Sequence, residues 1–453
     1  MKIRRLRLHP ERTRRGVAVL GLALLLLPNL AGGAPQVSGK VTLAIVGGQV
    51  LDGTGAPPIA DGVVLISGDR IASVGPAGAI AIPPGTKVVR ADGMTVMPGL
   101  IDMHVHLAMI GSAEGGDFVR AHADREEREI MPAGARQYLM NGVTTVRDVG
   151  APIEILKVRD RINHGELVGA RLFVAGPLLQ KHHSELMTGW SWEVANTEDA
   201  RQKVRQLVAA DVDWIKIHDQ INFSEDEVAA IAEEAQRGHK PLAGHAYQND
   251  AEIARALKYH FKTFEHTGIG RAYEYSPDTI RSIIGADVCL DPTLAVRYTF
   301  FETERFPARR NDLIASQSLP ADLYQHLNSS LADYEHLASA DVDRRYAKNI
   351  RRKLEPLVLG GACIVVGTDS GEPGLIHGST TWYELKNLME MGMTPMEAIT
   401  ASTWRAGHLL APDIGALRPG FHADVILVKG DVLADVGLLQ DVAHVFKDAV
   451  QYK

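Results

Sequence analysis

Between residues 97 and 412 of this 453-residue chain, short apolar runs alternate with amphipathic stretches. This alternation is typical of repeated βα units around a parallel sheet, and it constrains the fold more than any other feature of the sequence. Eight runs have the length and β-branched content of strands: 99–107, 143–150, 170–176, 213–219, 241–247, 262–268, 287–294 and 363–371. They predict an α/β fold, a (β/α)8 TIM barrel over residues 97–412, with its active site at the carboxyl ends of the strands.

The sequences on both flanks of this region are also typical of β-strands. Residues 35–96 and 413–453 are rich in β-branched residues and in Gly-Asp or Asp-Gly turn signals. Because the termini of a domain tend to lie close together, we expect the two flanks to pair into one small β-sandwich domain. Residues 295–345 form a long, aromatic-rich insertion after the seventh strand, which we expect to act as a lid or as an oligomer contact.

The first 34 residues have the three-part order of a secretory signal. Residues 1–15 are basic, residues 16–31 are apolar, and residues 32–34 are small enough for cleavage. Two arginines just before the apolar run resemble a twin-arginine signal. The apolar run is short for a membrane span of about 20 residues. We therefore expect residues 1–34 to be a signal peptide, and the mature protein to be periplasmic or secreted without a stable membrane span.

Charge and cysteine content exclude several classes of function. The formal net charge is −7, and once the basic leader is set aside the chain has 41 basic and 54 acidic residues. A body this acidic disfavours nucleic acid and anionic membranes as partners. The two cysteines, Cys289 and Cys363, are too few for a disulfide framework, and we expect them to be core thiols.

Six polar residues lie toward the ends of the predicted strands. Side chains alternate between the two faces of a strand, so in GLIDMHVHL both histidines can point into the barrel mouth. The same period of two places Lys216 with His218 in DWIKIHD, and His266 with Phe264 in KTFEHTG. The six residues are His104, His106, Lys216, His245, His266 and Asp369.

The composition of this set predicts two divalent metal ions, with zinc as the expected element, because imidazole and carboxylate suit Zn²⁺. The lysine needs a separate explanation. An ammonium beside two cations would be strongly disfavoured, so we infer that Lys216 is neutral and has captured CO₂. The resulting carbamate, N6-carboxylysine at Lys216, has two oxygens that can bridge the metals.

These motifs carry a resemblance to a known family. VMPGLIDMHVHL, VGTDSG and the six-residue set resemble the amidohydrolase superfamily in its binuclear, carboxylated-lysine subtype. TPMEAITASTWRAGHLL followed by IGALRPGFHADVILV is similar to its last barrel helix and returning strand. Within the superfamily, the chain looks most like the branch of prolidases, ochratoxinases and imidazolonepropionase-like enzymes. Relatives are often large homo-oligomers, so the resemblance implies a homo-oligomer, of which an octamer is one form.

The resemblance also implies roles for the six residues. His104, His106 and Asp369 would hold one metal, and His245 and His266 the other, with a bridging hydroxide and the carbamate of Lys216 between the metals. Metals depress the pKa of bound water, which makes a hydroxide available as the nucleophile. Asp369 would be catalytic, taking the proton of that nucleophile and passing it to the leaving amine.

Substrate contacts are expected on the loops of the barrel mouth. His182 and His183 follow the third strand, Tyr247 shares a face with His245, and His377 follows the eighth strand. For these four residues a role in packing weighs equally with a role in substrate binding. Arg147 and Asp148, side by side in TTVRDVG, are expected to form a buried pair that organises the second strand.

The reaction that the resemblance favours is hydrolysis of an amide next to a free carboxylate, as in a metallo-carboxypeptidase or dipeptidase. A dipeptide, an Xaa-Pro peptide, an N-acyl amino acid and ochratoxin A all fall within that class. One alternative is hydrolysis of cyclic amides, lactones or organophosphate esters on the same metals, since fold and metal centre alone do not choose the bond. Another is a non-catalytic assembly protein, which has no need of six intact ligands.

Overall fold

The computed structural model describes residues 39–182, 187, 189–270, 272–298, 312–332, 345 and 347–453. The predicted signal peptide lies outside these ranges, and so does most of the aromatic part of the insertion. Within the described ranges, no helix combines the length and the apolar character that crossing a bilayer requires.

Each of the eight stretches expected to be a strand contains one. The strands are β8 (Leu100–Val105), β9 (Val143–Asp148), β10 (Arg171–Val174), β13 (Ile215–Ile217), β14 (Leu242–His245), β15 (Thr263–Glu265), β16 (Cys289–Asp291) and β17 (Cys363–Ile364). They belong to a 3-stranded sheet in the order β10-β9-β8 and a 7-stranded sheet in the order β12-β11-β13-β14-β15-β16-β17. All of these pairings are parallel. The additional strands β11 (Leu178–Gln180) and β12 (Ser191–Glu193) follow β10.

Backbone hydrogen bonds connect the two sheets. On one side, Asp213 N–H donates to the carbonyl of Val174 over 2.8 Å. On the other, Met103 N–H donates to the carbonyl of Val366, and Asp369 N–H to that of His104, each over 2.8 Å. This part of the chain therefore has a TIM-barrel-like α/β fold, in which the ends of β8 lie beside the segment after β17.

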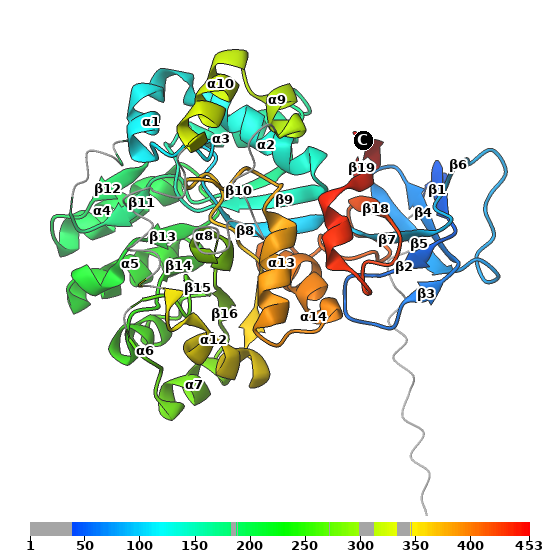
Figure 1. Ribbon diagram of the computed structural model, residues 1–453. Coiled ribbons are helices and arrows are strands. Elements are labelled where there is room, and N and C mark those ends of the chain that lie inside the picture. The colour runs from blue at the N-terminus through cyan, green and yellow to red at the C-terminus, as the bar shows by residue number, and fades with distance from the viewer. Residues whose placement is uncertain are drawn as a thin grey trace, which may run out of the picture. The chain divides into compact units, whose positions relative to one another are not determined.

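Helices follow the strands and pack around them, as Figure 1 shows for the green and yellow segments. They are α1 (Gly116–Ala121), α2 (Met131–Met140), α3 (Ile155–Asn163), α4 (Thr197–Ala209), α5 (Glu225–Arg237), α6 (Asp250–Lys258), α7 (Pro277–Ile284), α8 (Leu294–Tyr298), α9 (Leu313–Ser318), α10 (Ala321–Ser330), α12 (Ile350–Leu359), α13 (Thr381–Glu390), α14 (Pro395–Thr400) and α15 (Ala406–Leu410). Local sequence sets their starts. Ser224 forms a capping box with Glu227 at α5, and the side chain of Asn196 accepts the first amides of α4.

The flanking segments form two further sheets. One is 4-stranded in the order β5-β4-β1-β6, and the other is 6-stranded in the order β20-β19-β18-β7-β2-β3. The strands are β1 (Leu43–Val46), β2 (Gln49–Val50), β3 (Ile59–Ala60), β4 (Gly62–Ser67), β5 (Arg70–Pro76), β6 (Lys87–Arg90), β7 (Met94–Pro98), β18 (Val425–Lys429), β19 (Val442–Lys447) and β20 (Val450–Gln451). Antiparallel pairing of β7 with β18, Val425 opposite Pro98, brings the two ends of the described chain into one sheet.

Alternation of side chains along the strands divides the core from the site. On β13, Ile215 and Ile217 are buried in the main hydrophobic cluster, while Lys216 between them lines a cavity. On β15, Phe264 packs in the same cluster, whereas Thr263 and Glu265 contact Arg147 on the opposite face. The expectation that His266 shares a face with Phe264 is therefore wrong, because β15 ends at Glu265 and the chain turns at His266.

The two cysteines form a disulfide and are not free thiols. Cys289 on β16 and Cys363 on β17 are register partners, with 4.5 Å between their Cα atoms and a sequence separation of 74. The expectation of two core thiols is wrong because sheet pairing brings together two residues that are far apart in sequence. The bond joins the two strands at the base of the insertion.

This bond gives a testable prediction. We expect protein denatured without reductant to show no reactive thiol, and to show two thiols per chain after reduction. Exchange of both cysteines for serine should lower the free energy of unfolding by about 2–4 kcal/mol, because the disulfide restricts the unfolded chain. Urea denaturation of wild type and variant measures this change. Two reactive thiols in unreduced, denatured protein would contradict the assignment.

Candidate metal centre

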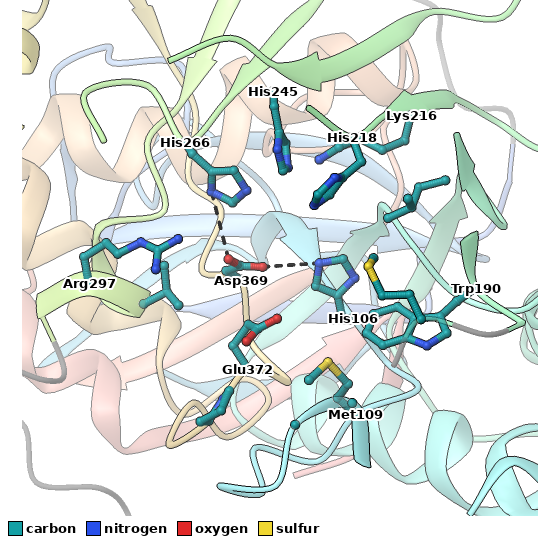
Figure 2. Close-up of a pocket in the computed structure, with 16 residues that line it drawn as sticks. His106, Met109, Trp190, Lys216, His218, His245, His266, Arg297, Asp369 and Glu372 are labelled. Carbon is teal, nitrogen blue, oxygen red and sulfur yellow. Dashed lines mark ion pairs between the residues drawn. The ribbon is translucent and has the colours of Figure 1, made fainter. Parts of the chain in front are cut away.

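A cavity of about 440 Å³ lies where the strands of the barrel-like region end. Figure 2 shows polar side chains from several strands pointing into it. The described residues that line it are His106, Met109, Gly115, Gly116, Leu178, Met187, Trp190, Lys216, His218, His245, His266, Val296, Arg297, Asp369, Glu372 and Pro373. Five of the six predicted ligands are among them, and the sixth, His104, contacts Asp369 from below.

The two histidines of β8 and the loop after it point toward the same carboxylate. His104 Nε2 lies 3.4 Å from Asp369 Oδ1, and His106 Nε2 lies 3.3 Å from the same oxygen. Their other nitrogens have separate partners: His104 Nδ1 is 2.7 Å from Glu265 Oε2, and His106 Nδ1 is 3.0 Å from the carbonyl of Gly150. Each ring is thus fixed through its Nδ1 atom and turns its Nε2 atom toward Asp369.

His245 and His266 are held in the same way. His245 Nδ1 lies 2.8 Å from Asp219 Oδ1, and His266 Nδ1 lies 2.6 Å from Thr293 Oγ1. Their ring centroids are 4.6 Å apart, and those of His266 and His104 are 4.8 Å apart. All four predicted histidine ligands therefore converge, each with Nδ1 engaged by an outer partner.

This arrangement fits a metal centre. A metal-binding histidine typically uses one ring nitrogen for the metal and donates the other N–H to a carboxylate, a carbonyl or a hydroxyl, which fixes the tautomer. Burial lowers the pKa of His245 and of His266 well below the usual value, so both rings are neutral and able to act as ligands. His104, His266 and Asp369 offer ligand atoms within 4.8 Å of one another.

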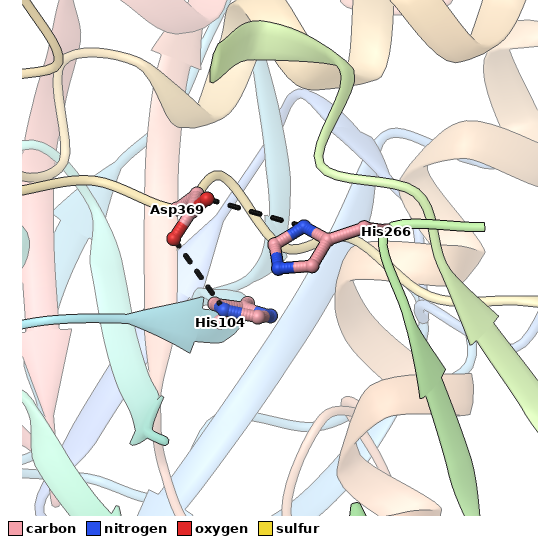
Figure 3. A group of neighbouring side chains, drawn as sticks. All are labelled: His104, His266 and Asp369. Carbon is pink, nitrogen blue, oxygen red and sulfur yellow. Dashed lines mark ion pairs between the residues drawn. The ribbon is translucent and has the colours of Figure 1, made fainter. Parts of the chain in front are cut away.

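Asp369 occupies the centre of the set. Figure 3 shows its two oxygens turned toward the rings of His104 and His266. Although burial alone would raise it, the neighbouring histidines, including a hydrogen bond from His106, hold the pKa of Asp369 well below its usual value. The carboxylate is therefore ionised and can act as a ligand or as a proton acceptor.

Lys216 lies on the same cavity wall and is buried. Burial, together with the positive charge of Arg147, lowers the pKa of Lys216. A lowered pKa makes the neutral amine available, and that form is the one that reacts with CO₂. The surroundings of Lys216 therefore suit the carbamate expected from the sequence.

A buried ion pair forms the floor of the site. Arg147 Nη2 lies 3.0 Å from Glu265 Oε1, and Nε donates to the carbonyl of Met103 over 2.6 Å. Burial alone would raise the pKa of Glu265, but Arg147 and the hydrogen bond from His104 hold it well below its usual value.

Arg147 and Asp148 do not pair with each other as expected, because adjacent residues of a strand face opposite ways. Asp148 instead accepts the amides of Leu107 and Gly150.

Four residues at the strand ends have left-handed backbone conformations. Their φ angles are 43° at Asp219, 60° at His266, 49° at Thr293 and 60° at Asp369. Residues other than glycine adopt this region at a cost of about 1–3 kcal/mol each, and a β-branched threonine does so least readily. Such strain is common at functional sites, and each of these four residues either converges on the cavity or contacts a histidine that does.

The residues predicted to bind substrate are placed differently from one another. The hydroxyl of Tyr247 donates to Asp219 Oδ1 over 3.4 Å, and its ring centroid is 5.6 Å from that of His245. His377 is fully buried, and its Nε2 lies 2.8 Å from the carbonyl of Met109, behind the cavity wall. His182 is exposed and is not among the described residues that line the cavity. His183 lies outside the described residues.

Sequence reasoning missed several residues of the site. His218 lines the cavity with its ring centroid 4.4 Å from that of His245, and its alternation with Lys216 on β13 was a signal that could have found it. Three further residues hydrogen-bond to the Nδ1 atoms of the histidines: Glu265, Asp219 and Thr293. No local sequence pattern identifies them. Trp190 and Arg297 come from segments for which no strand or motif predicted a position.

Comparison with known proteins assigns the chain to a family. A family model for the amidohydrolase family matches residues 95–452. The chain belongs to the amidohydrolase family. It is therefore a hydrolase that acts on carbon–nitrogen bonds, and the predicted resemblance to the superfamily is confirmed.

Individual relatives of this amidohydrolase include ochratoxinase from Aspergillus niger, which is 26% identical over 91% of this chain and 87% of that protein. A solved Xaa-Pro dipeptidase with bound methionine in the active site is 23% identical, with a TM-score of 0.71 over 91% of this chain and 99% of that one. Phenylurea hydrolase B is 22% identical, with a TM-score of 0.73 over 91% and 96%. The two solved structures support the TIM-barrel-like fold.

The ion pair at the floor of the site gives a second prediction. Exchange of Glu265 for glutamine should lower metal affinity about 10- to 100-fold, because His104 then donates to a neutral group. It should also lower the free energy of unfolding by about 3–5 kcal/mol, since Arg147 keeps its buried charge without this partner. Metal titration and urea denaturation measure the two effects.

Glu126 provides a matched control for that variant. It is also a buried glutamate, but burial raises its pKa to about 8, so glutamine resembles its neutral form at pH 7. Glu126→Gln should leave metal affinity unchanged and unfolding nearly so. Equal effects of the two exchanges would show that Glu265 has no special link to the metal centre.

Proposed function

We propose that this protein is a binuclear metal-dependent amidohydrolase that cleaves an amide next to a free carboxylate. The observation that carries the proposal is the convergence of four imidazoles, Asp369 and Lys216 on one cavity, each imidazole with its Nδ1 engaged by an outer partner. Membership of the amidohydrolase family supports the reaction class.

In this proposal, His104, His106 and Asp369 would hold one divalent ion and His245 and His266 the other, and the carbamate of Lys216 would add oxygen ligands. Nitrogen and oxygen ligands of this kind suit zinc. Two such ions supply Lewis acidity and lower the pKa of water toward neutrality.

Asp369 moves the proton. Its carboxylate is ionised, because the surrounding histidines hold its pKa well below the usual value. In hydrolysis of an amide, water adds to the carbonyl carbon and the carbon–nitrogen bond breaks, so a proton must travel from the water to the leaving nitrogen. An oxygen of Asp369 accepts that proton and then donates it to the amine. The Tyr247 hydroxyl donates to Asp219, the carboxylate that holds His245, so Tyr247 helps to orient that histidine.

The substrate class is proposed from the relatives. Ochratoxinase is similar to this chain over most of its length, and the Xaa-Pro dipeptidase of the same fold holds methionine in its active site. An N-acyl amino acid, a dipeptide such as Xaa-Pro, and ochratoxin A fit this class. The acidic charge of the chain gives no support to a nucleic acid as substrate.

Further parts of the proposal concern the whole molecule. We propose that the parallel strands close into an eight-stranded barrel over residues 97–412, and that residues 35–96 and 413–453 form a β-sandwich domain. We also propose that residues 1–34 direct export and that the chain assembles into a homo-oligomer. The Cys289–Cys363 disulfide supports export, because disulfides persist in oxidising compartments.

The first test joins metal analysis to a hydrolysis screen. We expect about two metal ions per chain and chelator-sensitive cleavage of Xaa-Pro dipeptides, N-acyl-phenylalanines or ochratoxin A. Lactones, cyclic amides and phosphotriesters complete the panel. Two metals with turnover of those esters alone would move the assignment to the other bond class. Protein that is stable and binds no metal would overturn the proposal.

Exchange of Asp369 for asparagine tests the proton transfer. We expect turnover to fall about 1000-fold, because an amide cannot accept the proton. Most of the metal should remain, since the histidines and Lys216 are unchanged. Asp213→Asn is the control: Asp213 pairs with Arg159 and accepts the amide of Val174 just before β13, and it does not line the cavity among the described residues. Near wild-type turnover of Asp369→Asn would remove the proposed role.

A further inference from the structure

The cavity has two unlike walls on either side of Asp369. Met109, Leu178, Met187 and Trp190 form one wall, which we name the apolar wall. Arg297 extends from the opposite side, beside Val296. Figure 2 shows Trp190 and Met109 on one side of Asp369, and the guanidinium of Arg297 pointing toward the cavity from the other. A molecule whose reacting bond lies over Asp369 therefore meets an apolar surface at one end and a cation at the other.

The backbone just before Arg297 is held by two contacts. The amides of Leu294 and Ala295, at the start of α8, donate to the buried carboxylate of Glu384 on α13 over 2.9 and 2.6 Å. Just before them, Thr293 Oγ1 lies 2.6 Å from His266 Nδ1. The start of α8 is thus tied to a predicted ligand histidine, three residues before Arg297.

Arg297 is the cation on its side of the cavity among the described residues that line it there, and Val296 beside it is apolar. A guanidinium is the side chain that best matches a carboxylate, because two of its N–H groups can donate to the two carboxylate oxygens. This side of the cavity therefore suits a negatively charged end of a substrate.

The apolar wall is supported by a hydrophobic cluster of its own. Met109 and Trp190 belong to it together with Leu323 and Leu327 of α10, a helix of the insertion. Trp190 also lies against a predicted ligand, with its ring centroid 5.6 Å from that of His106. The wall is thus preformed and close to the reacting centre, which suits an aryl or alkyl group of a substrate.

We infer that Arg297 selects the substrate by binding its carboxylate, while the apolar wall receives the acyl group. This inference rests on the proposed function and deepens it. The substrate is then an N-acyl amino acid with an aromatic or alkyl acyl group, oriented with its amino acid portion toward α8. A guanidinium matches a carboxylate in a two-pronged hydrogen bond that a lysine cannot reproduce.

A cycle of two substrates and two enzymes tests the role of Arg297. The substrates are an N-acyl-phenylalanine and the same compound with its carboxylate replaced by a neutral carboxamide. We expect Arg297→Gln to lower kcat/KM for the carboxylate about 100-fold, mostly through KM, and to change kcat/KM for the carboxamide less than about threefold. Arg297→Lys should fall between wild type and Arg297→Gln.

The control is Arg351→Gln, which removes an exposed arginine of α12 that pairs with Glu355. It should leave both substrates unaffected. Equal loss of both substrates in Arg297→Gln, or an unchanged ratio between them, would overturn the inference. Absence of amide hydrolysis by the wild-type enzyme would instead overturn the proposed function.

A measurement on the wild-type enzyme keeps the test independent of the folding of the variant. Phenylalanine, the product with a free carboxylate, should inhibit at a concentration at least about tenfold lower than phenylalaninamide, since charged hydrogen bonds exceed neutral ones in strength. Equal inhibition by the two compounds would contradict a carboxylate site. For the apolar wall, Trp190→Ala should reduce the preference for a benzoyl over an acetyl group in N-acyl-phenylalanines. An unchanged preference would place the acyl group elsewhere.

Discussion

The ion pair between Arg147 and Glu265 is the interaction on which the site depends. Both side chains are fully buried, and together they connect β9, β15 and β8 through the carbonyl of Met103 and the ring of His104. Two charges in the interior are costly to desolvate, and a well-packed apolar pair often serves stability equally well. Their presence is better explained by what they orient, because Glu265 holds His104 in the tautomer and direction that a metal ligand needs.

The other three predicted histidine ligands of the site are oriented in the same way, each by a different chemical group. A carbonyl supports His106, a carboxylate supports His245 and a hydroxyl supports His266. These supports come from segments that the fold brings together, and several of them occupy strained backbone conformations at the strand ends. Rigid strands below and strained turns above thus place the imidazoles within a few ångströms of one another, which is the precision that a metal centre demands.

Local patterns predicted the strands and most of the residues that converge on the cavity, because the period of two within a strand is a local property. GLIDMHVHL and DWIKIHD show this, with Lys216 lining the cavity between two core isoleucines. Prediction failed where contacts are long-range or the strand stops. Glu265 supports His104 across 161 positions, and Cys289 pairs with Cys363 across 74. On β15 the alternation does not reach His266, because the backbone there is left-handed.

The disulfide between β16 and β17 has a consequence for how the chain tolerates cleavage. Every residue between Cys289 and Cys363, Arg297 and α10 included, belongs to a loop whose ends are joined covalently. A protease that cut anywhere within this loop would leave two fragments linked by sulfur, with the two strands still bonded to each other. A cut within the long insertion would therefore not separate the parts of the chain that surround the candidate metal centre.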